Sequence, residues 1–156
     1  MSQSTPDLCD QFPDIIRVLS AGFETYGGRE AFGGPACTVK CFEDNSCVRE
    51  MAGTLGGGRV MVVDGGGSLR RALLGDKIAA RAAKNGWAGF VIAGAVRDVE
   101  ILRGLDLGVK ALGAVPVRTV RRCLGEVGVP VVVGGVTICP GENIFADATG
   151  IVVLPA

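Results

Sequence analysis

The sequence predicts an α/β fold, and two observations support this prediction. Short apolar runs with the length of buried strands alternate with helical patterns through the middle of the chain. Glycine, at 25 residues, separates these runs, while aromatic residues make up only 5% of the chain, which is typical of tight turns and small-residue packing. A chain of 156 residues can bury a substantial core, so we expect one domain, residues 1–156.

The first third is predicted to begin with a helix. Thr5 is expected to be its N-cap, with Pro6 in the first turn, and the helix is expected to run to about Leu19. Glycine pairs then predict a loop, an alternating apolar pattern predicts a strand, and Asn45 is expected to cap a short helix. These three segments are, in order, residues 27–35, 36–42 and 45–51.

The middle third alternates strands with helices. A strongly apolar strand, an edge strand, a helix that begins at Gly75 and a buried strand follow one another: residues 59–64, 69–74, 75–84 and 87–92. The apolar side chains of the first helix share one face, where alanine permits close approach to a sheet: Ile78, Ala79, Ala82 and Ala83. A second helix is expected to begin at Asp98, and its inner side is expected to carry Val99, Ile101, Leu102 and Leu105.

The last third is predicted to be rich in strands. Strands are expected at residues 109–117, 127–133 and 151–154, and residues 134–141 carry a further strand into a turn. A second turn is expected at residues 147–150, just before the last strand.

Composition argues against several classes of function. Basic and acidic residues each number 16, so no basic excess favours nucleic acid. No apolar run has the length of a membrane span, and the polar start of the chain does not resemble a signal sequence, so we expect a cytoplasmic protein. The six cysteines form no C-x-x-C pair and the chain has no histidine, which argues against a zinc site; we expect buried, reduced thiols.

The pattern that points to chemistry is Gly75-Asp76-Lys77-Ile78 followed, after 20 intervening residues, by Arg97-Asp98. A strand-helix-strand crossover makes its two strands parallel, so the turns after both strands meet at one edge of the sheet. Gly75 lets the backbone approach a ligand, and the N–H groups of residues 76–78 lie in a first helical turn, where they favour a carboxylate or phosphate.

The second turn supplies complementary groups. Arg97 can bind a carboxylate or a ketone oxygen through two donors, and Asp98 is a hard oxygen ligand suited to Mg²⁺ or Mn²⁺. Asp76 can orient a metal-bound water or transfer a proton. Each residue also has a structural interpretation: the two aspartates as acids at helix N-termini, Arg97 and Asp98 as a surface ion pair, and Gly75 as a turn.

Several stretches resemble the RraA-like family, which includes 4-hydroxy-4-methyl-2-oxoglutarate aldolases and regulators of ribonuclease E activity. The similarity covers nearly the whole chain, and the most specific part is Asp76-x20-Arg97-Asp98 in its context. The other matching stretches include Tyr26-Gly27-Gly28, Val62-Val63-Asp64-Gly65, Asn85-Gly86-Trp87 and Leu107-Gly108-Val109. The resemblance implies a swivelling β/β/α domain assembled as a homotrimeric ring, with sites at the contacts between subunits.

The resemblance also implies roles for the site. Gly75, Asp76, Lys77 and Ile78 would bind a small 2-keto acid. Arg97 would bind the substrate and stabilise an enolate, and Asp98 would hold the divalent metal. The implied reactions are retro-aldol cleavage to pyruvate and decarboxylation of oxaloacetate, without a Schiff-base lysine. One departure is Ile101, at a position where family aldolases commonly carry an acid; Glu100 precedes it.

Three other functions remain open. A surface of the trimer could bind and inhibit ribonuclease E without catalysis. The glycine-rich residues 62–68 faintly resemble a loop that binds a nucleotide or S-adenosylmethionine, although Arg70 stands where the last glycine of that motif belongs. The domain could also have lost its activity and be purely structural.

Overall fold

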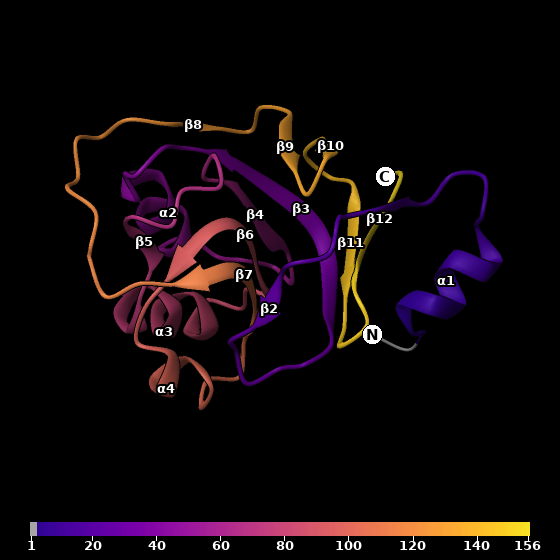
Figure 1. Ribbon diagram of the computed structural model, residues 1–156, viewed down its shortest axis with the longest axis horizontal. Helices are drawn as coiled ribbons and strands as arrows, with labels where there is room; N and C mark the ends of the chain where they lie inside the picture. The colour runs from indigo at the N-terminus through magenta and orange to yellow at the C-terminus, as the bar shows by residue number, and fades with distance from the viewer. Residues whose placement is uncertain (1–2) are drawn as a thin grey trace.

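The structure of the chain is a computed structural model that describes residues 3–156 (Figure 1). Residues 1 and 2, which begin the predicted domain and the polar start of the chain, lie outside the described residues. The helices are α1 (Thr5–Gln11), α2 (Ser46–Ala52), α3 (Asp76–Lys84) and α4 (Val99–Leu102). The strands are β1 (Arg17–Val18), β2 (Glu24–Thr25), β3 (Phe32–Lys40), β4 (Val60–Asp64), β5 (Ala72–Leu74), β6 (Gly89–Val96), β7 (Gly108–Ala114), β8 (Glu126–Val127), β9 (Val131–Val133), β10 (Val136–Ile138), β11 (Asn143–Ala146) and β12 (Ile151–Leu154).

A sheet of 10 strands organises the chain, in the order β1-β12-β11-β3-β4-β6-β7-β2, with β5 paired to β6 and β8 paired to β3. Strands β3, β4, β6 and β7 are parallel neighbours, whereas β11, β12 and β1 extend the sheet in antiparallel fashion. Strands β9 and β10 form a separate hairpin. The parallel half comes from the segment in which the sequence alternates strands and helices, as expected.

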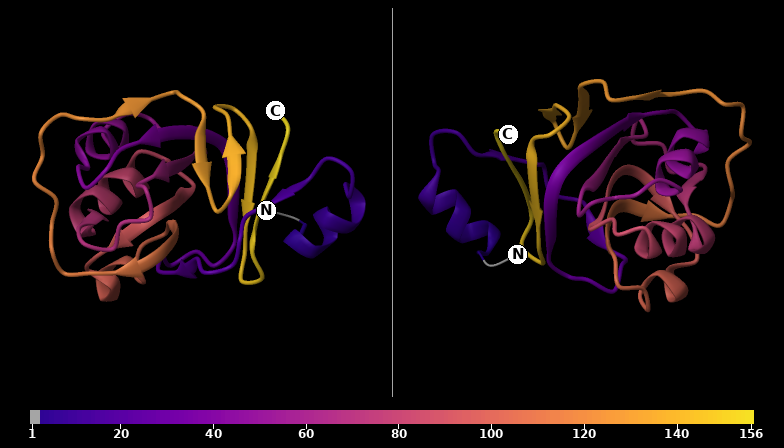
Figure 2. Two further views of the ribbon diagram at one scale, coloured as in Figure 1. Left: turned by 45° about the horizontal axis from the view of Figure 1, so that its top comes forward. Right: turned by 180° about the vertical axis from the view of Figure 1, so that it is seen from behind.

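The central strands are buried on both faces, which explains their continuous apolar sequence. In β4, Val60 and Val62 face one hydrophobic cluster while Met61 and Val63 face the other, and all four are fully buried. The first cluster joins the parallel strands to the hairpin β9-β10 and to the antiparallel strands β11 and β12, and the second joins the parallel strands to α2, α3 and α4. The result is a β/β/α arrangement of layers, as Figure 2 shows, and it confirms the predicted α/β class.

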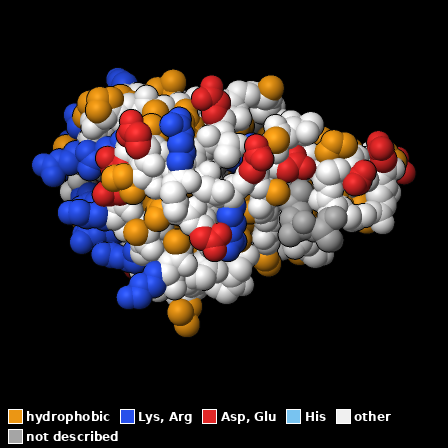
Figure 3. All heavy atoms as spheres, turned by 90° about the horizontal axis from the view of Figure 1, so that it is seen from below, with side chains coloured by type: hydrophobic (Ala, Val, Ile, Leu, Met, Phe, Trp, Pro, Cys, Tyr) orange, Lys and Arg blue, Asp and Glu red, His pale blue; other side chains and the backbone are white. Residues whose placement is uncertain are grey.

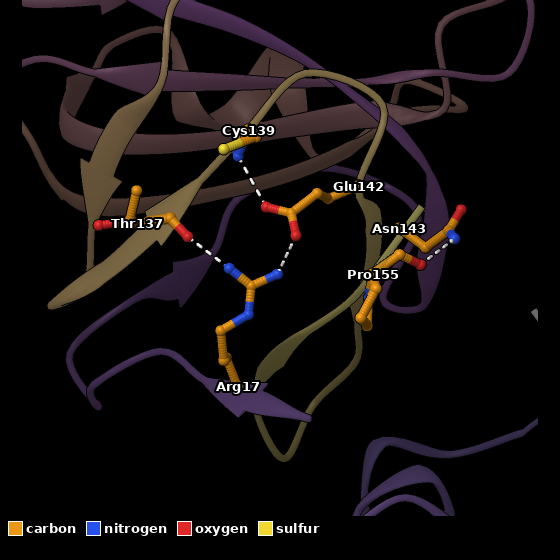
Figure 4. A network of polar contacts seen from close by, with 6 residues as sticks. All are labelled: Arg17, Thr137, Cys139, Glu142, Asn143 and Pro155. Carbon is orange, nitrogen blue, oxygen red and sulfur yellow. Dashed lines mark hydrogen bonds and ion pairs between the residues drawn. The ribbon is translucent and has the colours of Figure 1, made fainter. Parts of the chain in front are cut away.

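The N-terminal segment closes the antiparallel side of the molecule. Helix α1 packs Leu8 against Val152 and Leu154, on the far side of β12 from the rest of the sheet (Figure 2). Arg17 in β1 pairs with Glu142 and donates a hydrogen bond to the carbonyl oxygen of Thr137 at 2.6 Å (Figure 4). These contacts fasten β1 to β10 and to the segment that joins β10 to β11.

The predicted first helix is wrong in both its cap and its length. Ser4 is the N-cap and accepts a hydrogen bond from the Asp7 N–H, while Thr5 binds the carboxylate of Asp147. The helix ends at Gln11 rather than near residue 19. Phe12 precedes Pro13, and a residue before proline is disfavoured in the helical conformation, so the chain leaves the helix and forms β1 instead.

Other element boundaries also differ from the prediction. Strand β3 includes Gly33 and Gly34, which were expected in a loop; a Cβ on Gly34 would lie 2.0 Å from the carbonyl oxygen of Gly58, so a close backbone approach requires glycine there. The expected strand at residues 127–133 is two strands, separated at Gly128 with its φ of +78°. The edge strand expected at residues 69–74 is only the three-residue β5. Helix α4 is a single turn, and Ile101, which was expected on its inner side, is 50% exposed.

The cysteines are all free thiols, but their burial differs from expectation. Cys37 and Cys41 are buried, whereas Cys123 and Cys139 are exposed and the other two are intermediate. Burial raises the pKa of the Cys41 thiol to about 12. Over residues 3–156, none of the helices has the length and apolar character needed to cross a membrane.

Candidate functional site

Two turns meet where β5 and β6 end, as the spacing predicts. The strands are parallel neighbours, with Leu74 beside Val96, and the Arg97 N–H donates to the Leu74 carbonyl oxygen at 2.9 Å. Strand β4 pairs with β6 only as far as Ala93. Beyond this residue, β5 replaces β4 as the neighbour of β6. Gly75 and Arg97 therefore leave the sheet side by side, and the predicted convergence of the two segments is confirmed.

Gly75 leaves room for the side chains of the Arg97-Asp98 turn. Its φ of −131° is open to any residue, but a Cβ there would lie 2.9 Å from Asp98 Oδ2 and 3.3 Å from Arg97 Nε. A larger residue would displace these side chains, so glycine keeps both of them close to the start of α3.

A cavity of about 440 Å³ opens beside this contact, a volume typical of sites for small ligands. All five residues predicted to bind substrate line it: Gly75, Asp76, Lys77, Ile78 and Arg97. Asp98 lies directly behind Gly75 and is absent from the lining. The remaining wall is formed by Asn45, Ala72, Arg118, Thr119, Val120 and Arg121.

The first turn of α3 is less open than predicted. The Asp76 N–H donates to Asp98 Oδ2 at 3.1 Å, and the Lys77 N–H donates to Asp76 Oδ1 at 2.8 Å. Of the three N–H groups expected to bind an anion, only that of Ile78 has no hydrogen-bond acceptor within residues 3–156. The carboxylates of the site thus occupy two of the positions that were assigned to a ligand.

Asp98 combines a structural contact with a free oxygen. Its Oδ2 caps α3 across the two turns, while Oδ1 accepts no hydrogen bond within residues 3–156, and its side chain is 34% exposed. Arg97 Nε lies 3.9 Å from Oδ2, too far for a hydrogen bond, so this pair is a weak ion pair. The guanidinium also makes a long contact of 3.5 Å from Nη1 to the Pro116 carbonyl oxygen.

The donor set suits a metal that keeps most of its water. Within residues 3–156 no group of three or more histidine, cysteine or acidic side chains is arranged to enclose a metal ion. Mg²⁺ is often bound by one or two carboxylates with several waters retained, and Asp98 offers one free carboxylate oxygen. The residues present therefore fit a loosely held Mg²⁺ or Mn²⁺ and not a fully protein-ligated ion.

Three residues of the cavity wall escaped the sequence analysis. Asn45 was expected to cap α2, yet its side chain makes no cap hydrogen bond; Asp44 accepts from the Ser46 N–H instead. Arg118 and Arg121 belong to an irregular segment without periodicity, so nothing in the sequence connects them to the Gly75 turn. The local richness in arginine between residues 118 and 122 was the one available signal.

The glycine-rich residues 62–68 do not form a dinucleotide-binding loop. Residues 65–71 are turns and bends that lead directly into β5, so no helix follows the glycines. Arg70 pairs with Glu43 at 2.7 Å. The geometry that places a phosphate on a helix N-terminus is therefore missing at this turn.

Comparisons with known proteins agree with the fold and with the family resemblance. Residues 5–153 match the family described as "RraA-like: Aldolase/RraA". A protein of Ectopseudomonas mendocina named "Putative 4-hydroxy-4-methyl-2-oxoglutarate aldolase" is 55% identical over 155 residues, which cover 99% of this chain and 96% of that protein.

Two solved structures are similar over nearly their whole length. The RNA-processing inhibitor RraA from Thermus thermophilus superimposes with a TM-score of 0.95 at 46% identity, over 99% of this chain and 94% of that one. A structure from Geobacillus kaustophilus, titled as an S-adenosylmethionine:2-dimethylmenaquinone methyltransferase, gives a TM-score of 0.96 at 44% identity, over 98% and 95%. With the family match, these similarities show that the chain belongs to the RraA-like family.

Proposed function

We propose that this protein is a carbon–carbon lyase that acts on small 2-keto acids through a pyruvate enolate. The proposed reactions are cleavage of 4-hydroxy-4-methyl-2-oxoglutarate to two molecules of pyruvate and decarboxylation of oxaloacetate to pyruvate and carbon dioxide. The observation that supports this most strongly is the meeting of the Gly75 turn and Arg97 at one cavity of ligand size. Relatives at about 55% identity carry the aldolase name.

Both reactions need the same stabilisation. Breaking the bond to C3 of the keto acid moves an electron pair toward the ketone oxygen, which becomes negatively charged. Arg97 is proposed to orient the substrate and to donate to this oxygen; one well-placed donor of this kind is worth about 3–4 kcal/mol in comparable sites. The free Ile78 N–H at the start of α3 is proposed to bind the carboxylate beside the ketone.

Asp76 is the carboxylate that lines the cavity, and we assign proton transfer to it. In the aldol cleavage it would take the proton of the C4 hydroxyl, the C3–C4 bond would break, and C3 would be protonated afterwards. Asp98 would hold a divalent metal through its free oxygen. Such an ion, when bound, supplies further stabilisation of negative charge on the ketone oxygen. Lys77 is exposed and is given no covalent role.

A panel of 2-keto acids tests this proposal. Purified protein should release pyruvate from 4-hydroxy-4-methyl-2-oxoglutarate and from oxaloacetate in the presence of Mg²⁺, and excess EDTA should abolish the release beyond the spontaneous rate. Absence of pyruvate from every substrate of the panel would rule out the lyase, and full activity in EDTA would remove the metal from the proposal.

A second candidate function is inhibition of ribonuclease E. It is favoured by the structural neighbour from Thermus thermophilus, which is described as an RNA-processing inhibitor. Such a role needs a protein-binding surface and no catalysis, so it is independent of the cavity. Co-purification with ribonuclease E, compared between the wild-type protein and a variant with Arg97 replaced, separates the two: binding that survives the loss of lyase activity would assign the protein both properties.

A further inference from the structure

The wall of the cavity opposite the Gly75 turn is formed by a segment with no regular structure. We name residues 115–125, which run from β7 toward β8, the strap; it is the orange loop on the left of Figure 1. The strap passes beside β5, where the Ala72 N–H donates to the Val117 carbonyl oxygen at 2.7 Å. It thereby brings Arg118 and Arg121 to the cavity that holds Arg97.

The cavity carries an excess of positive charge. Four cationic side chains line it, Lys77, Arg97, Arg118 and Arg121, against the single carboxylate of Asp76. Three of these cations, all except Arg97, form no ion pair within residues 3–156. The chain as a whole has no net charge, and Figure 3 shows lysine and arginine side chains gathered at the end of the molecule away from α1. A single 2-keto carboxylate bound beside Arg97 would leave most of this positive charge without a counter-charge.

Arg121 is held in place by a buried network. Its Nε donates to Asn45 Oδ1 at 3.0 Å, and the Thr119 hydroxyl donates to the same oxygen at 2.7 Å. Asn45 Nδ2 donates in turn to the Leu73 carbonyl oxygen at 3.2 Å, so the network rests on β5. Asn45 and Thr119 are each only 6% exposed. The terminal nitrogens of Arg121 donate to no other described residue and stay available to a ligand.

We infer that Arg118 and Arg121 form a second anion position that binds the far carboxylate of a 2-keto dicarboxylate, and that Asn45 is a positioning residue for Arg121. This inference rests on the proposed function, because it names the residues that select the substrate of the same site. Arg121 also borders a second cavity of about 480 Å³, but Asn45, which fixes its Nε, lines only the first.

The second anion position favours one of the two proposed reactions. In the aldol cleavage the far carboxylate keeps its charge and leaves as part of a pyruvate, so binding to arginine is retained in the transition state. In the decarboxylation the same group loses its charge as it becomes carbon dioxide. Arginine then stabilises the ground state more than the transition state, which raises the barrier. The strap arginines therefore direct the site toward aldol substrates.

Calorimetric binding of two unreactive probes in the presence of Mg²⁺ tests the inference: 2-oxoglutarate, with two carboxylates, and 2-oxobutyrate, with one. The wild-type protein should prefer 2-oxoglutarate. Arg118→Gln and Arg121→Gln should each weaken 2-oxoglutarate binding about tenfold and leave 2-oxobutyrate within about twofold. Arg122→Gln is the matched control on the strap, since Arg122 lines neither of the two cavities that Arg121 borders, and it should change neither affinity.

A double-mutant cycle tests the positioning role. Asn45→Ala should reduce the preference for 2-oxoglutarate as Arg121→Gln does, and the double variant should lose little more than either single variant. Damage to the fold would instead weaken both probes equally. A wild-type protein without preference for 2-oxoglutarate, or strap variants that weaken both probes alike, would overturn the inference.

Kinetics separate this inference from the proposed function. If the wild-type protein is a lyase, Arg121→Gln should lower kcat/KM for the aldol substrate about tenfold, whereas kcat for oxaloacetate decarboxylation should rise, because arginine no longer stabilises the ground state. A wild-type protein that prefers 2-oxoglutarate to 2-oxobutyrate but has no lyase activity would contradict the proposed function and support the second anion position.

Discussion

Asp98 adopts a backbone conformation that aspartate tolerates better than most residues. Its φ of 57° and ψ of 42° lie in the left-handed region, which costs energy for residues other than glycine. Within residues 3–156 only Glu43 and Cys123 share a positive φ among the non-glycine residues, and both lie next to the strap or belong to it. The strained Asp98 backbone lies directly after Arg97, which lines the cavity, and strained residues are common at functional sites.

Replacing Asp98 by asparagine distinguishes its two possible roles, as a cap of α3 and as a metal ligand. Asparagine tolerates the left-handed conformation and can accept the Asp76 N–H, so the cap on α3 and the stability should be kept within about 1 kcal/mol. The variant loses the charge that would hold a metal, so Mg²⁺-dependent pyruvate release should fall about 100-fold or more. Urea denaturation and a pyruvate assay measure the two effects. Unchanged turnover in Asp98→Asn would mean that Asp98 only caps α3.

Arg97 should not be replaceable by lysine. A lysine ammonium keeps the charge but cannot present two donors in one plane to a carboxylate or a ketone oxygen. Arg97→Lys should therefore lose about 100-fold in kcat/KM, mostly in kcat if the donor acts on the developing charge. Steady-state kinetics with 4-hydroxy-4-methyl-2-oxoglutarate measure this loss, and near-normal values would exclude Arg97 from the reaction.

At the scale of elements, the strap depends on one buried carboxylate. Asp44 is 3% exposed, and its Oδ2 accepts the N–H groups of Arg122 at 2.7 Å and of Leu124 at 3.3 Å. Burial acts to raise the pKa of Asp44, but hydrogen bonds from Ser46 and from these two backbone groups outweigh it and lower the pKa below its usual range. The ionised carboxylate is therefore a tether that holds the strap to the start of α2.

This tether should make stability depend on pH. A lowered pKa means that the folded state binds the proton less readily than the unfolded state, so the contribution of Asp44 is present above the ordinary aspartate pKa, about 3.9. It is lost as the pH falls through the lower pKa of the folded protein. Asp44→Asn should cost about 1.5–3 kcal/mol of unfolding free energy at pH 7, and this difference should shrink below about pH 4. Urea denaturation across the pH range measures it, and a constant difference would contradict the tether.

The elements show which features a sequence can predict. The order strand, helix, strand over residues 69–96 is predicted correctly because β5, α3 and β6 each carry a strong local pattern, although β6 begins two residues later and ends four residues later than expected. The handedness of a crossover then fixes where Gly75 and Arg97 meet. The strap was missed because its position depends on Asp44 and Asn45, which lie more than 70 residues away in sequence. The helical pattern predicts too long a first helix because Pro13, which ends the helix near Gln11, interrupts it.

The N–H groups of the Gly75 turn show a similar limit. Their location at the start of a helix followed from the sequence, but their partners did not. The Asp76 N–H donates to Asp98 Oδ2 and not to a ligand because the two turns are in contact. Residue types and spacing do not specify such a contact. Residue types and spacing therefore predicted which groups gather at the cavity, and the structure was needed to show which of them remain free.

At the scale of the whole molecule, we predict a homotrimer. The strap and α4 expose apolar side chains beside the site, including Val120 at 54% and Ile101 at 50%, which a neighbouring subunit would cover. Light scattering should then give a mass of about three times the 16.0 kDa of one chain. A mass equal to one chain at micromolar concentration would contradict the trimer.

The central claim is that a 2-keto acid binds in the cavity lined by the start of α3 and Arg97, with Asp98 behind Gly75. A crystal structure of the protein with Mg²⁺ and pyruvate tests it most directly. The pyruvate carboxylate should accept the Ile78 N–H, its ketone oxygen should face the Arg97 guanidinium, and the metal should contact the Asp98 carboxylate. Pyruvate bound elsewhere, or Arg97 and Asp98 both without contact to pyruvate and metal, would contradict the assignment of this cavity as an active site.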